Sequence, residues 1–396
     1  MKLLILSFYY PPDLCAGSFR VKALLEALKP HRHHGICVEV ITTQPNRYRD
    51  TSNPAEVLED HGWLKVRRIG LPPHKSGMRD QARAFMSYAM GVRKYTASRE
   101  WDMVFATSSR LMTAALGAYV AHRLRLPLYL DIRDLFTDTL EDILAGSVLS
   151  HLLPAFRRLE RNTLRRANRI NVVSPGFIAH IRQIVPSIEP KIFTNGIDDE
   201  FLYTDFGKII TNAELPVILY AGNIGEGQGL HKIIPEAAKK LEGFAQIKII
   251  GDGGRLNQLS EAIECEGLSN VQLCPPIART NLLEEYRKAD VLFLHLNNHP
   301  AFLKVLPSKI FEYAATGKPI LAGLSGFAES FVCNELPGVS VFSPCSAEAM
   351  VKAFHKSLNQ SEKLDRRLFC EKYDRKRIMA EFALDILATI PQRLNN

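Results

Sequence analysis

The sequence lacks the features that mark membrane-spanning and disulfide-stapled proteins. Its 396 residues contain no apolar run of the roughly eighteen residues that a transmembrane helix needs. The opening apolar run, Leu3 to Tyr10, ends in two prolines and no small-residue cleavage site follows it, so it predicts a first β-strand and not a signal peptide. The seven cysteines are odd in number and scattered, without CxxC or Cys/His ligand spacing, which favours reduced thiols in a cytoplasmic protein.

Low-complexity tracts and internal repeats are also absent. The composition, 46% hydrophobic and 23% charged, is that of a folded globular protein, and the length exceeds the usual size of one domain, so two domains are expected. The net charge of +8 is moderate. No recognition motif accompanies it, which argues against nucleic acid as a partner.

Positive charge is concentrated in two segments. Between His151 and Ile170, six arginines oppose one acid, Glu160, and the apolar residues follow helical spacing. The arginines therefore fall largely on the opposite face, which fits a solvated helix or attraction to anionic lipid or a pyrophosphate-linked acceptor. The second segment is 75–99, where apolar and aromatic residues alternate with basic ones.

Short apolar runs rich in β-branched residues recur between helical patterns. In the first half they are KLLILSF, CVEVITT, DMVFAT, PLYLDI, RINVVS and KIFTN. After a polar stretch at 199–216, which suits a linker, come VILYAGN, QIKIIGDG, NVQLCPP, DVLFLHL, PILAGL and VSVFS. The alternation predicts an α/β fold with two Rossmann-like, doubly wound parallel-sheet domains that face each other across a cleft.

We place the first domain at 1–203 and the second at 204–375, with a C-terminal helix at 376–396 packing back on the first. Doubly wound sheets bind ligands beyond the carboxyl ends of their strands, so the loops at those ends are the places to search.

Glycines mark several of these loops. Gly17 precedes the first helix, the loop 222–229 holds four glycines, and Gly251 begins another loop. Neither the G-x-G-x-x-G fingerprint nor a P-loop is present. The loops offer main-chain N–H groups to phosphates or a sugar, and a planar base could lie between 249–256 and 274–280. A purely structural turn is the alternative for each.

The stretch VLPSKIFEYAATGKP, 305–319, predicts a short buried helix with charged residues near its start. Pro307 is favoured in a first turn, where Ser308 and Lys309 leave N–H groups free for an anion. Glu312 in such an apolar helix is costly unless it meets a partner. Two vicinal ribose hydroxyls are such a partner, because a carboxylate accepts from both; a salt bridge in the core is the alternative.

Over nearly its whole length, the chain resembles the retaining nucleotide-sugar glycosyltransferases of the GT-B fold, family 4, a group that contains bacterial surface-polysaccharide enzymes. The motifs that carry the resemblance are YYPPDLCAGSFR, YLDIRDLFTD, NVVSPGF, FTNGIDDEF, YAGNIGEGQGL, IIGDGGR, YRKADVLFL and LPSKIFEYAATGKPI. The GNIG…QGL and PSKIFEY variants look most like the branch with transferases of N-acetylated deoxyamino sugars such as fucosamine.

The resemblance maps the family's ribose-binding acid onto Glu312. The first acid of the same motif falls at Lys304, which puts the usual contact to the donor sugar in doubt. The Arg and Lys that clamp the diphosphate in the family become Asn223 and Gln228.

Another cation must then neutralise the diphosphate, and the candidates are Lys309, Lys304 and Arg20, in that order. The complete set of expected donor-binding residues is Gly17, Arg20, Gly222, Asn223, Gln228, Gly251, Asp252, Pro276, Ile277, Lys304, Leu306, Pro307, Ser308, Lys309 and Glu312.

The loop LYLDIRDLFTDTLED, 128–142, follows a strand of the first domain and should face the cleft. Asp134 and Asp131 are candidate catalytic residues that help to deprotonate the acceptor hydroxyl. Arg133 contributes to the resemblance through the RD pattern, or simply pairs with an aspartate. Lys309 is the third catalytic candidate, because it would stabilise the departing diphosphate. No Asp-x-Asp motif stands in a credible metal context, so we expect no cofactor and metal-independent activity.

The sequence and the resemblance together predict transfer of an N-acetylated amino or deoxyamino sugar from a UDP donor, with retention, to a saccharide or polyprenyl-diphosphate-linked acceptor. The product would enter surface-polysaccharide, O-antigen or capsule biosynthesis, and the protein would lie peripherally on the inner face of the cell membrane. Two alternatives stay open: a nucleotide-sugar 2-epimerase, and a catalytically degenerate protein that only binds sugar nucleotides. The missing dinucleotide fingerprint argues against a dehydrogenase.

Overall fold

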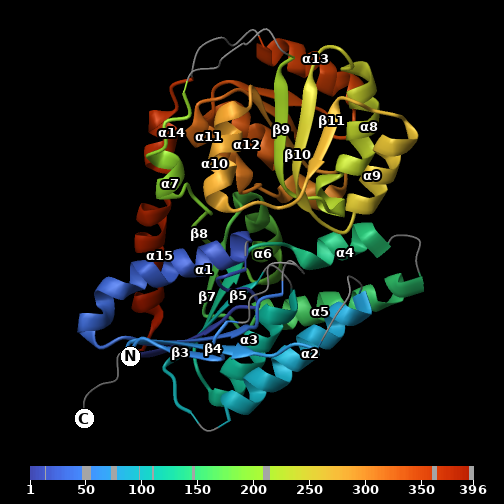
Figure 1. The fold of residues 1–396 in the computed structure, drawn as a ribbon. Coiled ribbons are helices and arrows are strands. Elements are labelled where there is room, and N and C mark those ends of the chain that lie inside the picture. The colour runs from blue at the N-terminus through green and yellow to red at the C-terminus, as the bar shows by residue number, and fades with distance from the viewer. Residues whose placement is uncertain are drawn as a thin grey trace. The chain divides into compact units, whose positions relative to one another are not determined.

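The chain forms two compact α/β units in the computed structural model (Figure 1). The described residues are 1–13, 15–46, 55–72, 78–97, 99–108, 111–144, 148–207, 215–358 and 364–391. The first unit comprises Met1–Asn195 and Arg375–Asn396, and the second comprises Gly196–Asp374. Each unit is built on a predominantly or wholly parallel sheet between helices, which confirms the predicted fold class.

The sheet of the first unit has the strand order β3-β4-β2-β1-β5-β6-β7-β8. β3 pairs antiparallel with β4, and all the other strand pairs in this order are parallel. Its strands are β1 (Lys2–Leu6), β2 (Cys37–Thr43), β3 (Leu58–Asp60), β4 (Leu64–Ile69), β5 (Met103–Ser108), β6 (Leu128–Ile132), β7 (Arg169–Val172) and β8 (Lys191–Ile192).

Helices cover both faces of this sheet (Figure 1). They are α1 (Ala16–Leu28), α2 (Met78–Tyr95), α3 (Leu111–Leu124), α4 (Phe136–Leu144), α5 (Leu153–Leu164), α6 (Ile178–Ile184) and α15 (Arg375–Thr389), with 3₁₀ turns at Lys29–His34, Val148–Leu152 and Pro175–Phe177. The C-terminal helix α15 buries Met379, Phe382 and Ile386 in one core with residues of α1 and the central strands. The apolar periodicity of this last segment therefore serves the first unit.

The sheet of the second unit has the order β11-β10-β9-β12-β13-β14, and all its pairs are parallel. Its strands are β9 (Val217–Asn223), β10 (Gln246–Asp252), β11 (Val271–Cys274), β12 (Val291–His295), β13 (Ile320–Gly323) and β14 (Val339–Phe342). Its helices are α7 (Asp199–Leu202), α8 (Leu230–Lys240), α9 (Leu256–Cys265), α10 (Arg279–Lys288), α11 (Lys309–Thr316), α12 (Phe327–Glu335), α13 (Ala347–Leu358) and α14 (Arg367–Lys372), with 3₁₀ turns at Glu226–Gln228 and Pro300–Lys304.

Successive residues of these parallel strands feed two cores, one on each face of the second sheet. Leu219 of β9 packs with α10, α11, α12 and α14, whereas its neighbours Ile218 and Tyr220 pack with α8, α9 and α13. Strands buried on both faces must be apolar throughout, which is why the sequence runs of this half were so easily recognised.

Two sequence expectations differ from the structure. The strands β3 and β4, at one end of the first sheet, were not predicted, because LKVRRI carries three basic residues. The polar stretch at 199–216 is also not simply a linker: it begins with α7, and Phe201 and Phe206 are each 1% exposed in the core of the second unit. Residues 208–214 of that stretch lie outside the described part of the chain.

Candidate functional site

The second unit gathers the predicted donor residues at the carboxyl ends of its strands, where α11 meets the end of β9. Gly222 is the sixth residue of the seven in β9, and Lys309 opens α11. A Cβ atom built on Gly222 would lie 2.4 Å from Cε and 2.9 Å from Nζ of Lys309. Only the absence of a side chain at Gly222 lets the lysine reach the end of β9.

The glycines at the ends of β9 and β10 also allow a close backbone contact. Gly222 and Gly251 face each other in the parallel register and have φ angles of 154° and 157°. A Cβ on Gly251 would lie 1.8 Å from the carbonyl oxygen of Gly222, and one on Gly253 would lie 2.4 Å from that of Ile224. Packing and backbone conformation alone therefore require glycine at both strand ends, whatever ligand they meet.

The loop after β9 is closed by an amide pair. Asn223 donates from Nδ2 to Oε1 of Gln228 over 2.7 Å, and the main-chain N–H of Gly225 donates to the same oxygen over 3.3 Å. Asn223 and Gln228 stand at the two positions where the family that the chain resembles has a diphosphate-binding Arg and Lys. In this chain, the pair shapes the loop and supplies no charge.

Glu226 anchors the same loop, and sequence reasoning missed it. Its carboxylate accepts from Nε of Arg255 at 2.7 Å and from Nδ2 of Asn297 at 3.0 Å, and Nζ of Lys232 lies 3.4 Å away. The loop is thus held to α9, to the end of β12 and to α8. An acid in the middle of a glycine-rich loop was the available signal.

His295, the last residue of β12, was also missed. It is fully buried, its Nδ1 donates to the carbonyl of Gln228 over 2.6 Å, and its Nε2 accepts from the N–H of Cys345 over 2.9 Å. These two bonds require a neutral ring with the proton on Nδ1. Burial lowers the pKa of His295 to about 4, because the charged ring would lose its solvation.

We expect acid to destabilise the second unit through His295. His295 takes up a proton near pH 6.5 in the unfolded chain but only near pH 4 in the folded chain. The stabilisation that the neutral ring gives to the folded state is therefore complete above pH 6.5 and is lost as the pH drops toward 4. The full loss is about 3 kcal/mol. Urea denaturation followed by circular dichroism at pH 7.5 and pH 5 should show most of this loss for the native protein and a smaller one for His295→Gln. Equal losses of stability in both proteins would contradict the assignment of a neutral, buried His295.

Helix α11 presents an anion-receptive first turn, as the sequence predicts. In the described part of the chain, the main-chain N–H groups of Ser308 and Lys309 have no hydrogen-bond partner. The Nζ atom of Lys309 lies 5.9 Å from the ring centroid of Tyr313. Burial lowers the pKa of Lys309, and Arg279 adds to that effect while Glu312 opposes it. A bound anion would oppose both effects, because it favours the charged form of the lysine.

Glu312 lies on the first turn of α11 and is partly exposed. Among the residues that the structure describes, no hydrogen bond or ion pair to its carboxylate is found. Arg279, whose pKa Glu312 helps to raise against the effect of burial, forms ion pairs with Asp198 and Glu200 instead. The carboxylate of Glu312 therefore has its hydrogen-bonding capacity available, and the salt bridge that was its alternative explanation is not found among the described residues.

The positions of the other predicted donor residues neither support nor contradict a contact with the donor. Leu306 is 3% exposed and its side chain belongs to the core, and Ile277 packs partly against that core. Pro276 is exposed after β11. The carboxylate of Asp252 accepts from the N–H of Gly253 at 2.7 Å, within its own loop. Lys304 ends the 3₁₀ turn before α11, and Pro307 follows shortly after it. Their contacts to a donor stay predictions.

In the first unit, the structure corrects the roles of Arg20 and Asp131. Nε and Nη2 of Arg20 donate to the two oxygens of Asp131 at 2.8 and 2.9 Å, and the side chains are 2% and 1% exposed. Thr107 and Asn171 also donate to Asp131, over 2.8 and 2.7 Å. Arg20 donates further to the carbonyls of 193 and 194. Arg20 is thus not an available cation, and Asp131 is not an available base.

Asp134 remains a candidate base. It lines a small pocket of the first unit together with Ser108, Leu111, Leu135, Glu160 and Thr163. Burial raises the pKa of Asp134 to about 6, although Arg133 and the N–H of Leu135 act in the opposite direction. A carboxyl group with a pKa near neutrality is better matched to proton transfer than an ordinary aspartate.

Among the described residues, Arg133 forms no ion pair or hydrogen bond with an aspartate, although Asp131 and Asp134 act on it electrostatically. Its guanidinium instead lies against the start of α1, where a Cβ on Gly17 would be 2.4 Å from Nη1. Gly17 is therefore needed for this close approach.

Comparison with known proteins is consistent across the chain. Residues 18–196 match the family model described as glycosyl transferase 4-like domain, and residues 204–377 match glycosyl transferases group 1. A protein of Escherichia coli (strain K12), named as the colanic acid biosynthesis glycosyl transferase WcaI, is 25% identical over 383 residues, which are 90% of this chain and 92% of that protein.

Solved structures share the fold at lower identity. Sucrose-phosphate synthase from Thermosynechococcus elongatus superposes with a TM-score of 0.74 at 16% identity and covers 98% of each chain. Anabaena HepE in complex with UDP-glucose gives 0.69 at 18% identity, with 98% of this chain and 100% of that chain covered. WaaG, a glycosyltransferase involved in lipopolysaccharide biosynthesis, gives 0.63 at 15% identity, with 99% and 100% covered.

Proposed function

Because this chain belongs to the glycosyltransferases of the GT-B fold and the family 4 type, we propose that it transfers a sugar from a nucleotide-diphosphate donor to a saccharide or polyprenyl-diphosphate-linked acceptor with retention. The observation that carries this proposal is the first turn of α11. Judged on the described residues, it combines a lysine without a carboxylate partner within hydrogen-bond reach, an acid with free hydrogen-bonding capacity and two free N–H groups. A nucleoside diphosphate has the complementary groups.

In the second unit, Glu312 accepts hydrogen bonds from the two ribose hydroxyls. The N–H groups of Ser308 and Lys309 and the ammonium group of Lys309 bind the diphosphate. Pro276 and Ile277 flank the base. Lys309 then contributes most where negative charge grows on the departing diphosphate, because a partly desolvated cation that needs no reorganisation stabilises such charge strongly.

The transfer step breaks the bond between the anomeric carbon and the oxygen of the β-phosphate, and the electron pair stays on the phosphate. The acceptor oxygen bonds to the same carbon. Its proton passes to a base, for which the Asp134 carboxylate or the leaving phosphate is available. With a pKa of about 6, Asp134 is largely ionised at neutral pH.

The relatives support a UDP donor and a role in surface polysaccharides. HepE was solved with UDP-glucose and with UDP and glucose, and the relative at 25% identity is named for colanic acid biosynthesis. We extend this to a UDP-linked amino or deoxyamino sugar, on the GNIG…QGL and PSKIFEY motifs, and to O-antigen or capsule assembly.

The test is turnover of a panel of nucleotide sugars with and without a polyprenyl-diphosphate saccharide. We expect free nucleotide only when acceptor is present, and the same rate with a chelator, because Lys309 and helix N–H groups serve the leaving group. Interconversion of the nucleotide sugar without acceptor would establish a 2-epimerase instead. Binding without turnover would establish a degenerate protein, which the Asn223–Gln228 pair favours. Loss of turnover with the chelator would contradict metal independence.

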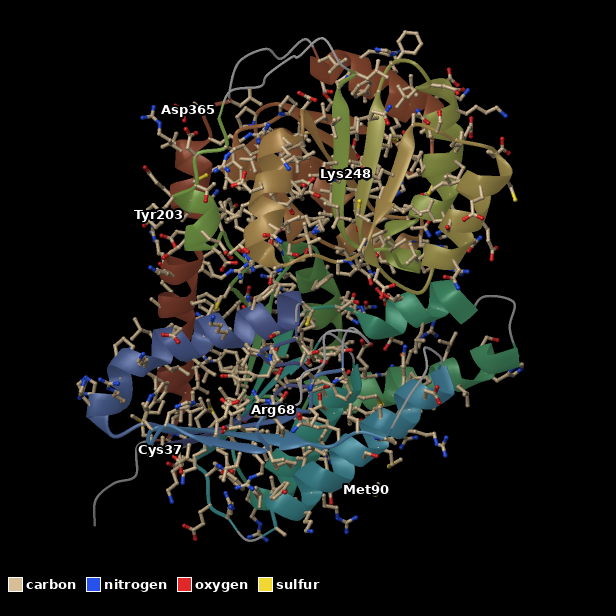
Figure 2. The ribbon with its side chains drawn as sticks, viewed as in Figure 1. Cys37, Arg68, Met90, Tyr203, Lys248 and Asp365 are labelled. Carbon is tan, nitrogen blue, oxygen red and sulfur yellow. The ribbon has the colours of Figure 1, made fainter. Side chains whose placement is uncertain are left out.

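Two helices of the first unit carry the proposed membrane contact. On α2, Met86 and Met90 are each 59% exposed, and Figure 2 labels Met90 on this helix. No helix among the described residues has the length and apolar character to cross a bilayer. Peripheral attachment by apolar side chains within a basic surface is the alternative that the sequence pattern supports. The exposed basic residues of α2 and α5 are Arg83, Arg93, Lys94, Arg157, Arg158 and Arg161.

We expect the protein to sediment with vesicles that contain phosphatidylglycerol and to be released as the ionic strength rises, because surface charges are screened within a Debye length. Vesicles of phosphatidylcholine alone serve as the control. Met86→Ser with Met90→Ser should weaken the binding at low salt. Sedimentation that is insensitive to salt would contradict a role for the arginines.

A further inference from the structure

We propose that the first unit has an anion-binding site of its own, formed by the guanidinium group of Arg133 and the first turn of α1, and that this site takes a phosphate group of a substrate. The inference rests on the proposed function, because phosphates occur in both the donor and the lipid-linked acceptor. The phosphate chemistry is common to the two sources, and the experiment below separates them.

Asp131, two residues before Arg133, already accepts as many hydrogen bonds as a carboxylate can. Asp131 accepts four hydrogen bonds, two on each oxygen, from Arg20, Thr107 and Asn171. A carboxylate offers about four acceptor positions, so none remains for a second arginine. Arg20 thus makes the hydrogen bonds to this buried carboxylate, and Arg133 is left with only its longer-range electrostatic effect.

Arg133 itself has no partner in the part of the chain that the structure describes. Its Nε atom is buried without a hydrogen bond, and no ion pair to its guanidinium is found. Asp131, Cys15 and Asp134 act on it electrostatically, but Asp131 spends its hydrogen bonds on other residues, and the one that Asp134 accepts comes from the N–H of Leu135. A desolvated, unpaired guanidinium is costly, and native proteins retain one where a ligand supplies the missing charge.

The start of α1 adds a second set of unsatisfied donors. The N-cap residue, Cys15, makes no side-chain capping bond, and the first turn contains no acid. Ser18 in that turn is 0% exposed, and its hydroxyl has no hydrogen-bond partner. The positive end of a helix normally attracts an acid, yet here a second positive group, the Arg133 guanidinium, lies against Gly17. An anion bound between the guanidinium and the helix start would offset the repulsion that remains.

The segment that carries Arg133 has another orphaned hydroxyl. Thr137, at the start of α4, is 2% exposed, and its Oγ1 has no partner. A planar guanidinium with two outer nitrogens, together with free N–H and hydroxyl groups, suits a tetrahedral oxyanion that accepts several hydrogen bonds at once.

The experiment compares the full-length protein with Arg133→Gln and Arg133→Lys, and with Arg182→Gln as a control that removes the same charge from an exposed surface pair with Glu189. Calorimetry measures binding of UDP in one arm and of geranylgeranyl diphosphate in detergent in the other. We expect Arg133→Gln to weaken one of these ligands at least tenfold, which identifies the source of the phosphate. Arg133→Lys should weaken it less, and Arg182→Gln should change neither.

A stability measurement separates this role from a structural one. Because Arg133 makes no hydrogen bond or ion pair with the described residues, Arg133→Gln without ligand should be as stable as the native protein or more stable. Loss of an arginine with a structural role would instead lower the free energy of unfolding. A clear loss of stability, or native affinity for both diphosphates, would overturn the inference. If the native protein binds UDP through Glu312 while Arg133→Gln leaves the affinity for both diphosphates unchanged, the proposed function stands and the Arg133 site is refuted. If the native protein binds no nucleotide, the proposed function itself fails.

Discussion

Replacing Glu312 by glutamine should lower kcat/KM for the nucleotide-sugar donor about 100-fold. The carboxylate would make two charge-assisted hydrogen bonds to the ribose, and each is worth about 1.5–3 kcal/mol. Glutamine keeps the size of the side chain but has one acceptor oxygen in place of two, and no charge. Since a loss of about 2.7 kcal/mol is a hundredfold change, one weakened and one lost bond suffice.

The fold should be indifferent to this change. Glu312 is partly exposed and makes no hydrogen bond or ion pair with the described residues, so Glu312→Gln should unfold at the temperature of the native protein. Glu329→Gln is the matched control, because Glu329 also stands in the first turn of a helix of the second unit, α12. Donor kinetics within a factor of about three of the native protein, in Glu312→Gln, would remove the ribose contact from the mechanism.

Replacing Asp131 by asparagine should instead destabilise the first unit by about 3–5 kcal/mol, which is the usual cost of leaving one buried charge without its partner. Arg20 would keep its positive charge at 2% exposure and lose the carboxylate that balances it. Asn171 and Thr107 would lose charged acceptors at the same time. Activity would fall because the unit unfolds, not because a base is missing.

The chain provides its own probe and control for this measurement. Both tryptophans, Trp63 and Trp101, belong to the first unit, so tryptophan fluorescence during urea denaturation reports on that unit alone. Asp60→Asn breaks an ion pair of nearly equal length, 2.9 Å to Lys65, whose side chains are both 46% exposed, and should have little effect. An Asp131→Asn protein that is stable but inactive would return Asp131 to the list of catalytic bases.

The periodicity of the sequence was enough to predict the strands and the fold class. Except for β4, each parallel strand of the two sheets corresponds to an apolar run that the sequence shows, because a strand buried on two faces has little choice of residue. The missed strands, β3 and β4, pair at one edge of the first sheet, where LKVRRI keeps basic side chains. The burial of Phe201 and Phe206 was not predicted, because the segment 199–216 contains few apolar residues among many polar ones.

The candidate site was predicted in part. The glycines at the strand ends and the free first turn of α11 follow from local rules on backbone conformation and helix ends, and the structure agrees with both. His295 could not be found, because its two partners lie 67 and 50 residues away along the chain and are main-chain groups without a sequence signature. Glu226 was overlooked among its glycines for a similar reason.

What the sequence determined by itself is therefore the buried strands, the helical segments between them and their order, since the alternation of apolar runs and helical patterns depends on neighbours close along the chain. What only the tertiary structure decided is which charges are available. Arg20 and Asp131 are 111 residues apart, and nothing in either segment shows that they neutralise each other. Electrostatic partners are chosen by distance in space. The same sequence analysis that places Glu312 correctly on its helix could therefore not tell that Arg20 is paired, while Arg133 has no hydrogen-bonding partner in the described part of the chain.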